Sequence, residues 1–124
     1  MNVKVRRMFS EREKELYVNL LRLCSPPITV LAKVKLSEFL TPDAEYGTDI
    51  FYHDFMELNK ITVPFLLWDG VSENVKAVVV LREEGRESPM LSANEWLKRC
   101  QIPLVEIGSF AELYTNGLIV NHAL

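Results

Sequence analysis

The chain has 124 residues, of which 48% are hydrophobic and 25% are charged, and its formal net charge is -3. This length suits a single domain with one core, and the apolar content excludes an intrinsically disordered chain. The acidic balance argues against a protein that coats nucleic acid through bulk electrostatics, because that mode of binding requires clustered lysine and arginine.

A small basic group stands near the start, where Lys4, Arg6 and Arg7 fall within four residues. We expect a solvated strand edge or tail here rather than a nucleic-acid patch. The two cysteines, Cys24 and Cys100, lack the spacing of a zinc or redox motif. Both are therefore expected to be reduced thiols in the core.

No membrane segment is expected from the sequence. The basic residues near the start are not followed by the apolar region of a signal peptide, and the longest nearly apolar stretch, residues 61–68, is too short to cross a bilayer. We therefore expect a cytoplasmic protein without membrane contact.

The first regular element predicted is a helix over residues 11–24. Ser10 and Glu13 have the spacing of a capping box, in which each side chain binds a backbone N–H group of the other residue. Apolar residues then recur at three- and four-residue spacing, which is typical of an amphipathic helix. The Ser25-Pro26-Pro27 sequence ends it, because a residue before proline disfavours the helical region.

Residues 28–36 are expected to form a strand, because apolar residues at the even-numbered positions alternate with more polar residues on a second, more exposed face. A short helical turn at residues 37–40 and a loop follow. Residues 48–59 fit a helix only loosely, since Tyr52, His53 and Asp54 interrupt the apolar pattern, and they are treated as an irregular segment.

Two β-rich runs come next, at residues 61–68 and 75–81. The polar residues 69–74 between them have the composition of a hairpin loop. The charged segment that follows, residues 82–88, is expected to be exposed.

The last third of the chain predicts a helix and a strand. Ser92, with Glu95 three positions later, has the capping-box spacing, and Trp96, Leu97 and Cys100 would form the buried side of that helix. A strand at residues 102–107, a helical turn near residues 110–114 and an apolar run at 118–120 complete the chain. This order predicts one α/β domain over residues 1–124, with a small mixed sheet and flanking helices.

Five short phrases, in this order and spacing, resemble an uncharacterised bacterial domain family of restriction-endonuclease-like fold, within the PD-(D/E)XK nuclease superfamily. They are FSERE at residues 9–13, KVKLSEFL at 33–40, VPFLLWD at 63–69, VVVL at 78–81 and QIPLV at 101–105. In that superfamily an Asp on one strand and a Glu on the next bind Mg²⁺, which activates water to attack a phosphodiester.

The resemblance places the Asp of the superfamily at Pro64 and the Glu at Val79. If the hairpin pairs Asp69 with Asn74, Pro64 lies directly across from Val79, so the two metal positions face each other. Proline and valine side chains carry no oxygen ligands for Mg²⁺. The resemblance therefore implies a degenerate, catalytically silent nuclease-like domain without a cofactor.

The other positions of the family pattern agree with this interpretation. Glu13 matches an acidic helix residue of the family, but the capping box already explains it. The polar continuation after the family's Glu, which usually includes a His, is replaced by residues 82–87, and an Arg often found near the end of the last strand is replaced by Glu106.

The alternative is an active Mg²⁺-dependent DNA endonuclease with a relocated metal site. Asp54, Glu83 and Glu84, with Asp49 and Glu87, would gather near one end of the sheet if residues 48–59 fold back. Glu83 shares a strand face with Val79 but stands about 13 Å along it. The competing view is that these are solvated loop acids. His53 with Asp54, and either with Cys24 or Cys100, would suggest nucleophilic catalysis, but we expect His53 to be a hydrogen-bonded or exposed residue.

The expected function is a regulatory module that binds a protein or associates with nucleic acid. A protein partner is favoured because the chain is acidic. A homodimer formed through residues 102–107 or through the apolar tail is compatible with either function.

Overall fold

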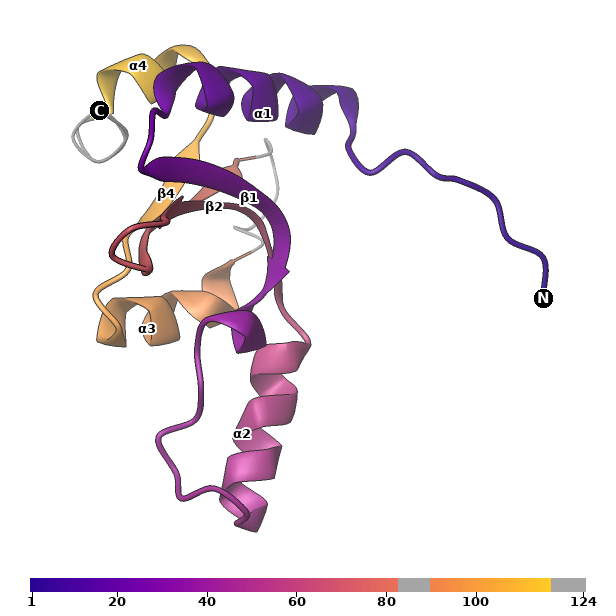
Figure 1. The fold of residues 1–124 in the computed structure, drawn as a ribbon, viewed down its shortest axis with the longest axis vertical. Coiled ribbons are helices and arrows are strands. Elements are labelled where there is room, and N and C mark those ends of the chain that lie inside the picture. Colours follow the sequence, from indigo (N-terminus) through magenta and orange to yellow (C-terminus); the bar gives the residue numbers. More distant parts are fainter. Residues whose placement is uncertain (83–89, 117–124) are drawn as a thin grey trace.

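The computed structural model describes residues 1–82 and 90–116, and in this part of the chain four strands form one sheet between helices (Figure 1). The strands are β1 (Ile28–Lys35), β2 (Thr62–Asp69), β3 (Asn74–Leu81) and β4 (Leu104–Ile107), and they lie in that order in the sheet. The helices are α1 (Glu11–Leu23), the short 3-10 turn η1 (Leu36–Glu38), α2 (Asp49–Asn59), α3 (Leu91–Arg99) and α4 (Ala111–Thr115).

The sheet is mixed, because β1, β2 and β3 pair antiparallel while β3 and β4 pair parallel. α1 and α4 cover one face and α3 covers the other (Figure 1). The sequence prediction of a small mixed α/β sheet with flanking helices is therefore confirmed. Within the described residues, no helix has the length and apolar character needed to cross a membrane.

Two hydrophobic clusters fill the two sides of the sheet. The α1-side core joins α1 and α4 to alternate strand residues; its buried members include Leu16, Leu20, Phe65, Val79 and Leu113. The α3-side core joins α3, η1 and the end of α2 to the other strand face; its buried members include Leu36, Leu58, Val78, Val80 and Leu97. Successive side chains of β2 and β3 point to opposite faces of the sheet, and both faces are covered by a core. Both strands are therefore apolar on both faces.

The predicted capping box at the start of α1 is present. The Glu13 amide donates to the Ser10 hydroxyl at 3.2 Å, and the Ser10 amide donates to the Glu13 carboxylate at 2.8 Å. Leu16 and Leu20 then carry the apolar stripe into the core. α1 ends at Leu23, before the proline pair, as the sequence predicts.

The hairpin forms as predicted at its tip, where Asp69 pairs with Asn74, but its register shifts further along. Trp68 pairs with Val75, whereas Leu67 pairs with Ala77, so Lys76 is an extra residue in β3. Without this bulge Lys76 would stand across from the fully buried Leu67. The bulge therefore keeps a charged side chain out of the core.

The predicted pairing of Pro64 with Val79 is wrong, because the bulge lies between the hairpin tip and these residues. Phe65 pairs with Val79, and the same register extended by one residue places Val80 opposite Pro64. At the tip, the Asp69 carboxylate accepts hydrogen bonds from the Ser72 and Val71 amides. These bonds hold the pKa of Asp69 below its usual value.

The prediction of an irregular segment at residues 48–59 is also wrong, because α2 occupies it. The Thr48 hydroxyl caps α2 by accepting from the Phe51 amide at 3.2 Å. Leu58 is the buried residue of this helix, and Tyr52, His53 and Asp54 occupy its solvent side. α2 projects away from the sheet, on the side opposite α1 (Figure 1).

α3 forms where expected, but Ser92 is not its cap. The helix begins at Leu91 with Met90 at the N-cap position, so Ser92 lies inside the first turn. Leu97 is buried and Trp96 partly buried, whereas Cys100 is exposed.

Cys100 is therefore not the core thiol that the sequence predicted, and Cys24 is only half-buried. β4 is shorter than predicted because Pro103 has no amide to donate to the sheet. α4 confirms the predicted helical turn. The predictions for residues 83–88 and for the apolar run at 118–120 lie outside the described residues.

Candidate functional site

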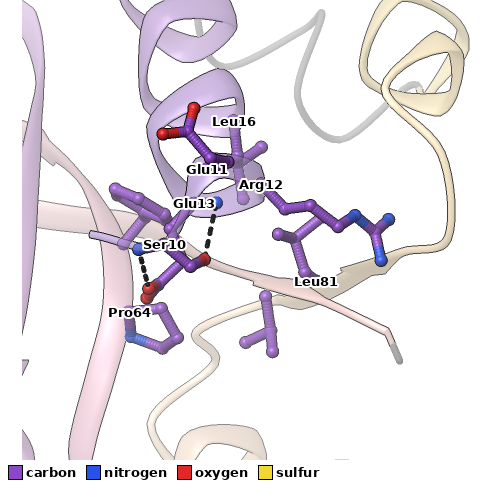
Figure 2. Close-up of a pocket in the computed structure, with 9 residues that line it drawn as sticks. Ser10, Glu11, Arg12, Glu13, Leu16, Pro64 and Leu81 are labelled. Atoms are coloured by element: carbon purple, nitrogen blue, oxygen red, sulfur yellow. Dashed lines mark hydrogen bonds between the residues drawn. The ribbon is translucent and has the colours of Figure 1, made fainter.

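A cavity of about 560 Å³ lies where the first turn of α1 faces β2 and β3 (Figure 2). One wall comes from the sheet and the other from the helix. Its lining residues are Ser10, Glu11, Arg12, Glu13 and Leu16 from α1 and its cap, and Pro64, Phe65, Val80 and Leu81 from the strands.

The sheet wall is apolar throughout. Pro64 and Phe65 come from β2, and Val80 and Leu81 from β3. Val80 is 1% exposed, and its side chain packs in the α3-side core, on the face of the sheet away from α1, so its backbone is the part that borders the cavity. These four side chains offer no oxygen ligand for a cation.

The helix wall carries two carboxylates, and each already has a partner. Figure 2 shows Glu13 tied to Ser10 by the two capping hydrogen bonds, beside Pro64. Glu11 pairs with Arg7, whose hydrogen bond and charge hold the pKa of Glu11 below its usual value. Glu13 therefore lies beside the apolar sheet wall, whereas the Glu11 carboxylate points away from it (Figure 2).

Arg12 supplies the positive charge at the cavity. Its Nη2 atom donates to the Gly108 carbonyl at 3.4 Å, and its guanidinium carbon lies 6.0 Å from the centre of the Phe110 ring. These contacts join α1 to the segment between β4 and α4.

The residues singled out from the sequence take different places. Pro64 lines the cavity, whereas Val79 points into the α1-side core across from Phe65. Val80, which the sequence did not single out, is among the lining residues, although its side chain packs on the α3 side of the sheet. The sequence signal for the shifted register is Lys76, because an unshifted pairing would place its charge across from the buried Leu67, and burying a charge is costly.

The acids of the relocated metal site are not brought together in the described part of the chain. Asp54 is exposed on α2, where its carboxylate lies 3.3 Å from the His53 ring, and Asp49 is exposed at the start of the same helix. Glu83, Glu84 and Glu87 lie outside the described residues. Within residues 1–82 and 90–116, no three His, Cys, Asp or Glu side chains form a group that could hold a metal ion.

Glu106 lies in β4, next to β3. The resemblance expects an arginine at this position. The Glu106 carboxylate is 3.7 Å from Nε of Arg82, the residue that follows β3. This ion pair joins the ends of the two parallel strands at the surface.

A family model described as a protein of unknown function, DUF2726, matches residues 5–114. The chain belongs to this family. The match includes every residue that lines the cavity, so both walls are part of the DUF2726 domain. Comparison with curated proteins found no match, and neither did comparison with solved structures.

Proposed function

We propose that this DUF2726 domain is a catalytically silent member of the PD-(D/E)XK class that acts in the cytoplasm as a protein-binding regulatory module. The observation that carries the proposal is the apolar sheet wall of the cavity. Pro64 lines this wall, and the β3 residues nearest to it across the hairpin are Val79, packed in the α1-side core, and Val80, packed on the α3 side. None of these positions, where a nuclease of this class would need carboxylates, carries an oxygen ligand.

The chemistry of such a nuclease explains why this wall matters. Mg²⁺ requires a near-octahedral set of oxygen ligands, several of them from water and substrate and at least one or two from carboxylates. Glu13 is the acid beside Pro64, and its carboxylate already accepts the Ser10 amide. The proposal therefore assigns Glu13 to capping α1 and leaves the cavity without a metal ion.

Charge favours a protein over nucleic acid as the partner. A phosphate backbone approaching the cavity from the α1 side would meet Glu11 and Glu13, and the chain as a whole carries a net charge of -3. Binding to DNA is driven largely by neutralising phosphates with lysine and arginine. This surface offers Arg12, whose guanidinium is already engaged with Gly108.

The test is incubation of the purified chain with supercoiled and linear DNA in Mg²⁺ or Mn²⁺, together with a gel-shift assay at low salt. We expect neither cleavage nor a salt-sensitive shift. Cleavage that is abolished by Asp54→Asn, Glu83→Gln or Glu84→Gln would establish the relocated metal site and overturn the proposal. Glu13→Gln is the matched control, because glutamine also completes a capping box.

A further inference from the structure

α2 presents large apolar side chains that nothing in the described chain covers. Tyr46 is 78% exposed and Met56 is 54% exposed, and Tyr52 is also on the surface. Tyr52 and Met56 are one helical turn apart and share a face. Tyr46 packs against Tyr52 with ring centres 6.2 Å apart, so the three residues form one surface, the α2 patch.

Aromatic and methionine side chains of this kind are typical of the centres of protein interfaces rather than of ordinary surface. α2 packs chiefly against η1, buries Leu58 and projects away from the sheet (Figure 1). The α2 patch is on the exposed surface of this helix and of the loop before it.

The α2 patch is surrounded by negative charge. Residues 41–60 contain five acids and one base, Lys60, which pairs with Glu57. Asp43 and Glu45 precede Tyr46 in the loop, and Asp49 shares the helix face of Tyr52. A complementary partner would therefore be apolar and basic.

The first eight residues of the chain have that composition. They form no helix or strand and run away from the body of the molecule (Figure 1). The Val5 side chain is fully exposed, and Val3 and Met8 are mostly exposed. In an extended chain Val3 and Val5 point one way and Lys4 and Arg6 the other, as in a strand with one apolar and one basic face.

We propose that the N-terminal segment, residues 1–8, of one copy docks on the α2 patch of a second copy. Val3 and Val5 would cover the aromatic surface, while Lys4 and Arg6 would reach the acids around it. The exchange is reciprocal, so two copies bury both segments and both patches in a two-fold dimer.

The free edge of β1 is a competing place for an extended segment to bind. Its exposed side chains include Lys33 and Lys35. These would repel Lys4 and Arg6, and like charges brought together across an interface are unfavourable. Charge thus favours the α2 patch. This inference is independent of the proposed function, because an active nuclease could form the same dimer.

The experiment measures dimer dissociation constants by sedimentation equilibrium of the full chain. We expect a dimer at about 100 µM protein and about 50 mM salt that weakens at about 500 mM salt, because screening reduces the attraction between exposed charges. The tail variant Lys4→Glu/Arg6→Glu and the loop variant Asp43→Lys/Glu45→Lys should each raise the dissociation constant at least about tenfold.

Combining the two variants in one chain restores opposite charges and should return the dissociation constant to within about threefold of the original. The loop acids are chosen because their reversal leaves the first turn of α2 intact, where Asp49 favours the helix. Lys33→Glu/Lys35→Glu is the matched control, with the same change of charge on β1, and should leave the dimer in place.

A variant that removes apolar side chains separates the contribution of apolar contact from that of charge. Tyr52→Ser/Met56→Ser should weaken the dimer at both salt concentrations, because it removes buried surface rather than a charge. A chain that stays monomeric at low salt overturns the proposal, and so does a dimer that survives both charge reversals or is broken by the β1 control. Circular dichroism confirms that each variant is folded.

Discussion

Cys24 and Cys100 illustrate how position within an element decides the environment of a side chain. Cys24 follows α1 and packs against the α1-side core, where burial raises the pKa of its thiol. Cys100 is three positions after the buried Leu97, a spacing that predicts the same helix face, but it lies one residue past the end of α3. The chain turns there, with Gln101 at a positive φ of 58°, so helical periodicity no longer applies.

This difference predicts unequal thiol reactivity. With a maleimide at neutral pH, Cys100 should be modified at least about tenfold faster than Cys24, because the reactive species is an accessible thiolate. Mass spectrometry of peptides from a time course of labelling measures both rates in one sample. Equal rates in the folded chain, or faster labelling of Cys24, would contradict the placement of these residues, and labelling in urea supplies the reference.

At the scale of elements, α1 and α3 show when a capping pattern can be trusted. Both carry a serine followed three residues later by glutamate, yet only Ser10 caps its helix. The residues just before Ser10 lie outside regular structure, whereas Met90 is buried and fixes the start of α3 two residues earlier than the pattern suggests. A local pattern gives way to the burial of a neighbouring apolar residue.

The two serines therefore make a matched pair of variants. Ser10→Ala should lower the free energy of unfolding by about 1 kcal/mol, because it removes the acceptor for the Glu13 amide. Ser92→Ala should change it by less than about 0.5 kcal/mol, since alanine is at least as favourable as serine inside a helix. Urea denaturation measures both, and equal losses would show that Ser92 caps α3 after all.

The remaining elements were predictable from clear local patterns. β1 follows from alternation, α1 follows from its stripe and its cap, and the hairpin follows from two β-rich runs joined by a polar loop. α2 was missed because apolar residues lie on both sides of it, with Leu58 turned inward and Tyr52 and Met56 turned outward. A helix whose exposed side is apolar has no clear helical period in its sequence.

At the scale of the whole molecule, one bulge connects the core to the candidate site. Lys76 shifts the register of β3, and this shift places Val80 rather than Val79 across from Pro64. The sequence was sufficient to identify Pro64 and the missing ligands, because residue types carry that information. It was not sufficient to identify Val80, because register depends on where the sheet accommodates a charge.

The central claim is that the cavity between α1 and the sheet holds no divalent cation. The most direct measurement is titration of the isotope-labelled chain with Mn²⁺, following paramagnetic broadening of backbone amide signals. The account predicts that the amides of Phe65, Val80 and Leu81 keep their intensities at one equivalent of Mn²⁺, since their surroundings supply no ligand set. Selective loss of these three signals at that concentration would contradict it.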